Sequence, residues 1–336
     1  MNSVSPTLLS ILRREKAFAG KSLRSFYAFT VRGVLAIIVG LTSFGEAASA
    51  DEVHLPPVNL GDTSFEDGIG FPGWMAEEIV DYYYAGQVND NDGEKIPGSN
   101  KFITLSATTH VVYLSRLRLL GAWYGAEFLI PLADVESDAN PGQNHRVQGV
   151  GDLTVSPFVL EWNDHKLFGK PYFHRLDLTV VLPTGQYDRN QPINIGDNLF
   201  SVNPYYAFTY IPTDHLELSA RLHYLWNSRN DRPFTGLGAD TIQPGQAFHA
   251  NFAASYRIFP ELRLGFNGYV LQQVTDDKVN GRSQPNSRER VFGLGPGIEW
   301  SSRAAGISIY INSYFETGVE NRPAGTKVVF RVSKVF

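Results

Sequence analysis

The chain contains no cysteine among its 336 residues and only two methionines. The lack of cysteine excludes disulfide bonds and thiolate metal sites, and it removes the risk of mispairing in an oxidising compartment. Although 43% of the residues are hydrophobic, no apolar run beyond residue 50 approaches the roughly 20 residues that a membrane-spanning helix needs. If this part of the chain lies in a membrane, it must therefore cross it as a closed β-barrel.

The first 50 residues have the organisation of a secretory signal peptide. A basic stretch from Arg13 to Arg32 precedes an apolar run from Val34 to Phe44, and Ala48 to Ala50 supplies small residues at the cleavage site. The competing interpretation is a retained membrane anchor, but the apolar run is too short to span about 30 Å of hydrocarbon. We predict cleavage after Ala50. The mature chain is then more acidic than the full chain, whose formal net charge is −5, and it has no basic face for nucleic acid.

The rest of the chain alternates between apolar and polar side chains at successive positions. Between His215 and Asn227, every second residue is Leu, Ala, Tyr or Trp, and the residues between them are mostly polar or charged. The stretch from Phe248 to Ile258 repeats this pattern. A period of two residues indicates a strand with one apolar and one polar face, whereas a helix would show a period of about 3.6.

About twelve such segments follow one another, each close to the roughly 9–11 residues that a tilted strand needs to cross a bilayer. Their approximate centres are Val80, Ala107, Gly125, Val155, Thr179, Tyr205, Leu222, Ala253, Phe266, Gly295, Ile309 and Phe330. The first segment is the least regular, because Glu77, Glu78 and Asp81 blur its two faces. A soluble β-sandwich also alternates, but its strands average about 5–6 residues.

The connections between these segments alternate in length. Long polar connections are expected at 88–100, 134–148, 185–196, 228–245 and 275–287, shorter ones at 116–118, 212–214, 260 and 301–304, and an intermediate one at 163–170, and a connection at 317–325 closes the series. Aromatic residues near strand ends fit two interfacial girdles; they are Trp74, Tyr82, Tyr84, Tyr113, Tyr210, Trp226 and Trp300. We therefore predict an all-β protein, a transmembrane antiparallel outer-membrane β-barrel of about 12 strands over residues 75–336. It would lie in the cell outer membrane, with its short turns and both termini in the periplasm.

The last segment carries an assembly signal. Val328, Phe330, Val332 and Phe336 share one face of it, and the sequence ends on Phe336. A terminal aromatic residue on an amphipathic strand is similar to the signal that the barrel assembly machinery reads. Lys334 departs from that pattern, because a hydrophobic residue is usual there.

Charged residues on the polar faces are expected to point into the lumen, because a lipid-facing charge costs roughly 2–4 kcal/mol at the bilayer midplane. The lumen or constriction candidates are Asp152, Arg175, Asp177, Glu217, Arg221, His223, His249, Arg257, Arg263 and Arg331, together with Tyr310 and Tyr314. These residues could form a structural ion-pair network, a solute-selecting constriction, or both. Gly293, Gly295 and Gly297 should share the inward face of one strand and leave room for a plug, a solute or wall curvature.

The stretch from Asp51 to Trp74 does not alternate. Pro, Gly and Asp dominate it. It is either a periplasmic tether or a plug that folds back into the lumen.

An enzymatic site is not predicted. A lipase-like site needs Ser, His and an orienting Asn or Asp within hydrogen-bond reach. His249 and Asn251 share a face, and Ser219 shares one with His223, but the spacing is loose and no G-x-S-x-G occurs. His223 and His249 lack an evident third metal ligand, so no metal site and no cofactor are predicted.

Four local patterns together resemble a known family. They are NLGDTSFEDG at 59–68, LPTGQYD at 182–188, LQQVTDD at 271–277 and GLGPG at 293–297. The chain resembles the outer-membrane family named for the MetA pathway of phenol degradation, including its sphingosine-inducible relatives. The resemblance implies a barrel linked to uptake of aromatic or other hydrophobic compounds, and it implies no catalytic residues.

The function we predict is passive uptake of small hydrophobic, aromatic or amphipathic compounds across the outer membrane. Tyr187, Tyr205 and Phe234 are candidates for the first contact with such a solute. The expected partners are outer-membrane lipid and lipopolysaccharide, the barrel assembly machinery and the solute, with no nucleic acid. The alternative is a non-conducting structural or binding barrel with a filled lumen, and a barrel hydrolase is a third possibility.

Overall fold

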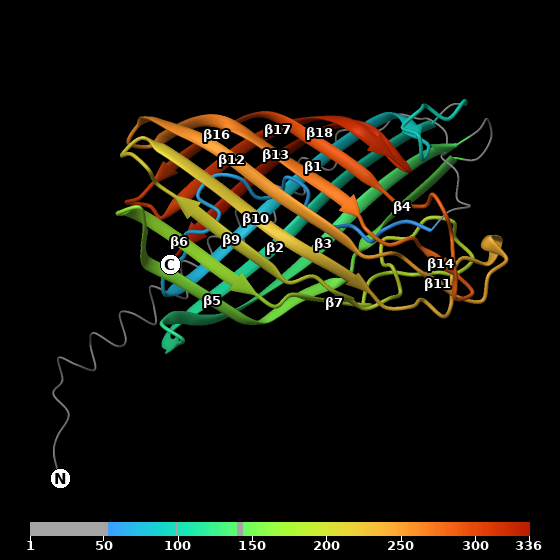
Figure 1. The fold of residues 1–336 in the computed structure, drawn as a ribbon, viewed down its shortest axis with the longest axis horizontal. Helices are drawn as coiled ribbons and strands as arrows, with labels where there is room; N and C mark the ends of the chain where they lie inside the picture. The colour runs from blue at the N-terminus through green and yellow to red at the C-terminus, as the bar shows by residue number, and fades with distance from the viewer. Residues whose placement is uncertain (1–52, 99, 140–143) are drawn as a thin grey trace, which may run out of the picture. The chain divides into compact units, whose positions relative to one another are not determined.

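The computed structural model describes residues 53–98, 100–139 and 144–336. The predicted signal peptide, residues 1–50, lies outside the described residues. The described chain is built almost entirely of antiparallel strands, which wrap around a lumen (Figure 1). No helix in this part of the chain is long and apolar enough to cross a membrane.

Twelve strands form a closed barrel, as the alternation predicted. Nine of them are unbroken: β1 (Gly73–Asn89), β2 (Asn100–Leu119), β3 (Ala122–Ala139), β10 (Leu216–Asn227), β12 (Ala247–Phe259), β13 (Leu262–Gln273), β16 (Arg290–Ser302), β17 (Ile307–Glu320) and β18 (Arg322–Val335). The other three are each divided into two pieces: β4 (Asn144–Val150) with β5 (Leu153–Leu167), β6 (Lys170–Asp177) with β7 (Val180–Leu182), and β8 (Ser201–Val202) with β9 (Tyr205–Tyr210). The predicted centre at Thr179 falls in the interruption between β6 and β7.

The first and last strands close the sheet. β1 pairs with β18 from Met75 opposite Val335 to Asn89 opposite Arg322. Neighbouring strands pair in sequence order around the rest of the wall. In hydrocarbon there is no water to satisfy a free strand edge, so closure is what makes a sheet viable there.

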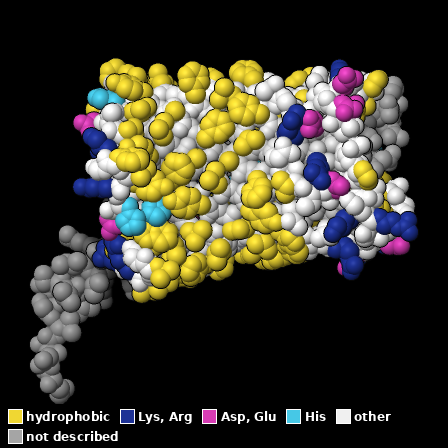
Figure 2. All heavy atoms as spheres, viewed as in Figure 1, with side chains coloured by type: hydrophobic (Ala, Val, Ile, Leu, Met, Phe, Trp, Pro, Cys, Tyr) yellow, Lys and Arg dark blue, Asp and Glu magenta, His cyan; other side chains and the backbone are white. Residues whose placement is uncertain are grey.

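The outer surface of the barrel is an apolar band. In β16, for example, outward Phe292, Leu294 and Ile298 are exposed, while Val291 and Glu299 at alternate positions of the strand are buried. Hydrophobic side chains cover the middle of the visible face, and charged side chains gather toward its two ends (Figure 2). Most of the predicted girdle residues are exposed on this surface, namely Trp74, Tyr82, Tyr84, Tyr113, Trp226 and Trp300.

Short turns lie at one end of the barrel, which we call the turn end, and the opposite end is the loop end. The turns at the turn end are 120–121, 168–169, 211–215, 260–261 and 303–306. Several predicted connections were wrong in their bounds. At the turn end, the turn after β2 lies at Leu120 and Gly121, not at 116–118, and the connection expected at 163–170 is the turn at 168–169. At the loop end, β3 and β4 extend into the range 134–148, and the connection expected at 317–325 is the single residue Asn321, whose φ of 52° permits the reversal.

The segments that connect strands at the loop end pack on one another. β11 (Ile242–Gln243), β14 (Lys278–Val279) and β15 (Arg282–Ser283) form a small sheet, and η1 (Thr235–Leu237) is a single helical turn. Asp277 joins two of these segments, because its Oδ1 accepts hydrogen bonds from Gly245 N and Gln273 Nε2, both at 2.7 Å. Asp277 is 1% exposed, and burial raises the pKa of its carboxyl to about 6.

We predict that the packing of these loops weakens as the pH rises. A carboxyl whose pKa is raised by folding stabilises the folded state below its unfolded pKa, and this contribution is lost as the pH rises through the folded pKa. For Asp277 the window runs from about 4 to about 6, and the contribution is roughly 3 kcal/mol at most. Hydrogen exchange at the amide of Gly245, corrected for its intrinsic rate, should therefore show less protection at pH 8 than at pH 5.

The Asp277→Asn variant is the matched control, because it keeps the acceptor oxygen and cannot ionise. Its protection at Gly245 should not change over the same range. A pH trend in the variant equal to that of the unaltered protein would contradict the prediction.

Candidate functional site

The inward face of the wall carries a network of buried charges near the turn end. Arg175 Nε donates to Glu161 Oε2 at 2.9 Å, and Arg175 NH1 lies 3.5 Å from Glu127 Oε2. His110 lies between two acids, 2.9 Å from Glu77 and 3.3 Å from Glu127. These residues come from β1, β2, β3, β5 and β6, so the network extends across neighbouring strands.

The network continues on the other side of the β1–β18 junction. Arg331 NH1 lies 3.5 Å from Glu77, and its guanidinium stacks 3.8 Å from the ring centre of Tyr310. Arg263 Nε lies 3.7 Å from Glu299 on the neighbouring strand. A buried charge is costly unless it is paired, and this arrangement gives each of these bases a carboxylate on the wall.

Two further predicted lumen acids are held by hydroxyl groups. Ser219 and Ser255 both donate to Glu217. Ser156 and Thr179 both donate to Asp177. All of these side chains are buried on the inward face. Hydroxyl donors stabilise a carboxylate without adding a charge, so these sites are compact polar contacts.

Residues 53–72 run through the lumen from the loop end to the turn end. Near the loop end, Leu55 N donates to Glu289 Oε1 at 2.8 Å. Near the turn end, Gly70 N donates to Glu161 Oε1 at 3.1 Å. Asn251 binds the middle of the segment, where its Oδ1 accepts from Gly61 N at 2.8 Å. The segment thus contacts the wall along the lumen without joining the sheet, and its trace lies among the barrel strands (Figure 1).

Three acids of the segment each bind a base of the wall. Asp62 lies 2.5 Å from Lys327 Nζ, Glu66 lies 2.7 Å from Arg263 NH2, and Asp67 binds Arg221 through two contacts of 2.9 and 2.6 Å. The Asp67–Arg221 pair is bidentate, which is the strongest common geometry for such a contact. Charge complementarity therefore fixes the register of the segment against the wall.

Glycines on both surfaces allow a close approach. Gly61 has a φ of +85°, and a Cβ there would lie 2.7 Å from the Tyr314 ring, whose hydroxyl donates to Gly61 O at 2.7 Å. On β16, a Cβ on Gly297 would lie 2.9 Å from the Phe65 ring, and one on Gly293 would lie 2.5 Å from the Tyr269 ring. Gly293 and Gly297 of β16 therefore make room for an aromatic ring of the wall and one of the segment.

The remaining predicted lumen residues lie in three different places: a connecting segment, the turn end and the inward face of β10 and β12. Asp152 binds the connection at 183–200, because its carboxylate accepts from Gly185 N at 2.6 Å and Asp197 N at 2.9 Å. Arg257 lies at the turn end and is only partly buried, 3.8 Å from Glu66. His223 and His249 stack with ring centres 4.2 Å apart. Their role as a solute constriction stays a prediction.

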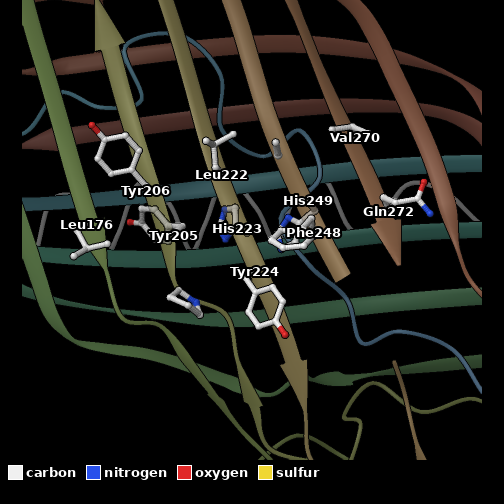
Figure 3. Close-up of a pocket in the computed structure, with 12 residues that line it drawn as sticks. Leu176, Tyr205, Tyr206, Leu222, His223, Tyr224, Phe248, His249, Val270 and Gln272 are labelled. Atoms are coloured by element: carbon white, nitrogen blue, oxygen red, sulfur yellow. The ribbon is translucent and has the colours of Figure 1, made fainter. Parts of the chain in front are cut away.

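A cavity of about 510 Å³ lies at the wall beside the two histidines (Figure 3). It is lined mainly by outward apolar and aromatic residues of β9, β10, β12 and β13, namely Tyr206, Leu222, Tyr224, Phe248, Ala250 and Val270. Pro204, in the interruption between β8 and β9, also lines it, as do the inward residues Tyr205, His223 and His249. Residues from both faces of the wall therefore meet at this cavity.

The geometry that a serine hydrolase needs does not form around these histidines. Ser219 and Ser255 donate to Glu217, and His249 Nε2 contacts Asn203 Oδ1 at 3.1 Å. Within residues 53–98, 100–139 and 144–336, no group of three His, Cys, Asp or Glu side chains is placed to hold a metal ion.

Comparison with known proteins identifies the family. A family model described as putative MetA-pathway of phenol degradation matches residues 85–332. The chain belongs to this family. The protein is an outer-membrane barrel. The matched range begins within β1, so the lumen segment lies ahead of it.

Solved structures of outer-membrane barrels resemble this member of the phenol-degradation family. An outer membrane channel from Pseudomonas putida F1 has 18% sequence identity and a TM-score of 0.71, covering 83% of this chain and 100% of that one. The transport unit of the autotransporter AIDA-I from Escherichia coli has 10% identity and a TM-score of 0.48, covering 79% and 90%. The toluene transporter TodX of Pseudomonas putida has 7% identity and a TM-score of 0.41, covering 79% and 90%. No curated protein sequence matches the chain.

Sequence reasoning on this family member missed much of the lumen network. The missed residues are the wall acids Glu77, Asp81, Glu127, Glu161, Glu289 and Glu299, the wall bases His110, Arg322 and Lys327, and the segment acids Asp62, Glu66 and Asp67. The alternation along β16 places Glu299 on the same face as Gly293, Gly295 and Gly297, so the sequence pattern could have predicted that Glu299 points into the lumen. No local signal indicates which base a segment acid meets.

We predict that Gly61→Ala loosens the segment in the lumen. The new Cβ would clash with the Tyr314 ring and strain a left-handed backbone position, at a cost of roughly 1–3 kcal/mol. Hydrogen exchange at the amides of Gly68 and Gly70 should rise by about tenfold or more.

Gly318→Ala is the control. Gly318 also has a positive φ, +59°, but a Cβ there would meet open space. This variant should carry the backbone strain without loosening the segment. Equal exchange in both variants would contradict the proposed contact with Tyr314.

Proposed function

We propose that the protein is a passive outer-membrane channel for small hydrophobic, aromatic or amphipathic compounds, closed in this state by residues 53–72. One observation carries the proposal: a closed barrel holds a segment that is tethered to β1 at Gly73 and bound by side-chain contacts instead of strand pairing. Such a segment can leave the lumen without breaking the wall. Family membership supports the proposal, as does the fold shared with an outer membrane channel.

The cavity at the wall supports the choice of solute. Its leucine, valine, phenylalanine and tyrosine side chains face outward with the apolar band, so this open hollow accepts an apolar or aromatic body and not a strongly hydrated one. Lipopolysaccharide makes the outer leaflet a poor solvent for such compounds, which gives a protein route a physical purpose. We make no proposal of catalysis or of a cofactor.

We further propose that the turn end faces the periplasm, which would place Phe336 and the start of β1 there. Short turns at the periplasmic side are typical of outer-membrane barrels. Phe336 N donates to Trp74 O at 2.9 Å, so the end of the wall is tied to its beginning. Phe336 would serve the barrel assembly machinery, and the apolar band would contact lipid and lipopolysaccharide.

The second candidate function is a non-conducting barrel that binds or supports without passing solute. The filled lumen favours it: Phe65, Asp67 and Ser64 of the segment are all at least nine-tenths buried. A non-conducting barrel requires that residues 53–72 never leave the lumen.

A reversible cross-link separates the two functions. Ser64 Oγ accepts from Asn312 Nδ2 at 2.9 Å, and the chain has no cysteine of its own. In the double variant Ser64→Cys, Asn312→Cys, oxidation should lock the segment in the lumen. Uptake of labelled neutral aromatic compounds by cells carrying this variant should fall by about tenfold and recover on reduction.

The two single-cysteine variants are the controls, and neither should respond to oxidation. Equal uptake with the cross-link formed and reduced would contradict gating by the segment. Uptake equal to that of cells without the protein, in every state, would favour the non-conducting barrel.

A further inference from the structure

Among the described residues, the buried Arg221 on β10 makes its one direct ion pair with Asp67 of the lumen segment, and Glu127 of the wall acts on it at longer range. The side chain is 7% exposed, and both its Nε and its NH2 contact the Asp67 carboxylate. Its guanidinium also lies 4.2 Å from the ring centre of Tyr205. A buried cation that loses its partner costs roughly 3–5 kcal/mol. When the segment leaves, this site therefore favours another carboxylate.

The other buried bases of the described wall differ from Arg221 in this respect. Each of them has a carboxylate partner outside the segment: Arg175 with Glu161, Arg263 with Glu299, Arg322 with Glu289, Lys327 with Asp81, and Arg331 with Glu77. Withdrawal of residues 53–72 leaves those pairs in place. Among the described residues, Arg221 is the buried base whose one direct ion pair is with the segment, and Glu127 of the wall would remain only at longer range.

A pocket for an aromatic ring lies beside this guanidinium. Phe65, two residues before Asp67, is 1% exposed and packs against Ala253 and Tyr310. Ala253 pairs with Ser219, and Asn251 pairs with Arg221, so the ring pocket and the guanidinium occupy adjacent positions of the β10–β12 pair. The segment thus presents one phenyl ring and one carboxylate to neighbouring points of the wall.

Unused polar atoms lie at the next inward position of β10. His223 is 6% exposed, lies within reach of the Asn203 backbone, and makes no side-chain hydrogen bond among the described residues. It stands beside His249 of β12 (Figure 3). The His223 ring therefore has hydrogen-bonding capacity left for a solute.

Resting on the proposed channel function, we infer that the lumen binds an aryl carboxylate, a solute with one aromatic ring and one carboxylate on a short arm. Its carboxylate takes the place of Asp67 on Arg221, and its ring takes the place of Phe65 against Ala253 and Tyr310. His223 offers a further hydrogen bond to the carboxylate or to a hydroxyl group of the solute. The segment is then a built-in competitor that occupies the site until such a solute displaces it.

Binding to the purified full-length protein in detergent micelles tests this inference, with empty micelles as the blank. The probes are 3-phenylpropionate and its neutral isostere 3-phenylpropanamide. The affinity of each for the protein is measured by titration calorimetry. The acid should bind about tenfold or more tightly than the amide, because a charge-assisted bidentate contact is available to it alone. Equal affinity for the acid and the amide would overturn the inference.

Two variants assign the contact. Asp67→Asn removes the competing carboxylate at constant size, so the affinity for the acid should rise by about tenfold while that for the amide changes by less than about twofold. Arg221→Gln should abolish the preference for the acid. The double variant Asp67→Asn, Arg221→Gln keeps the site neutral and should also show no preference, which covers the case in which an unpaired Asp67 prevents folding.

Arg146→Gln is the control, because Arg146 pairs with Asp134 on the neighbouring strand and lies outside the proposed site. It should leave both affinities unchanged. A preference for the acid that survives in the double variant would overturn the inference. Binding is measured without transport, so the two proposals fail separately. A protein that binds the acid but passes no solute would contradict the proposed channel and leave the binding site standing. A protein that passes neutral aromatic compounds but does not prefer the acid would contradict the binding site and leave the channel standing.

Discussion

The pairing of β1 with β18 is the constraint on which the rest of the structure depends. Within hydrocarbon a backbone group without a partner costs several kcal/mol, so a sheet survives there only without edges. Closure also decides the surroundings of every side chain, because alternate positions of a strand then face either lipid or an enclosed volume. In β16 this places Phe292 and Leu294 outside and Gly293 and Glu299 inside. The apolar band and the polar lumen are two consequences of one geometric condition.

An enclosed lumen makes the pairing of charges compulsory. Glu77, His110 and Glu127 lie on consecutive strands and satisfy one another at 2.9 and 3.3 Å. Such pairs add little net stability, since desolvation offsets most of the attraction, but breaking one is expensive. The lumen segment stays bound to the wall because breaking its buried ion pairs costs more free energy than forming them contributes. Arg221 depends on Asp67 for its counter-charge, so the occupied lumen and the folded wall stabilise each other.

The period of two residues was enough to predict the fold, because alternation is a local property that closure then requires. It located all twelve strands, and it placed Arg175, Glu217 and Arg331 on the buried inward face. The alternation does not predict which side chains pair across the lumen. Asp67 and Arg221 are separated by 154 positions, and their contact follows from the barrel register and the path of the segment together. Asp152 binds a connecting segment, because it lies within the interruption between β4 and β5.

The way in which the segment is held explains how a filled lumen is compatible with a channel. Its backbone N–H groups donate to side chains of the wall: Gly61 to Asn251, Glu66 to Glu217, Gly68 to Thr209 and Gly70 to Glu161. No strand hydrogen bond is used, so withdrawal leaves the sheet intact. Water that enters the vacated lumen can satisfy those acceptors, because polar groups bridge readily to ordered water. A buried guanidinium is different, since water replaces a carboxylate poorly in an enclosed site. If the segment leaves as we propose, the ion pair at Arg221 is the contact whose loss costs most, because Lys327 and Arg263 keep acids of the wall.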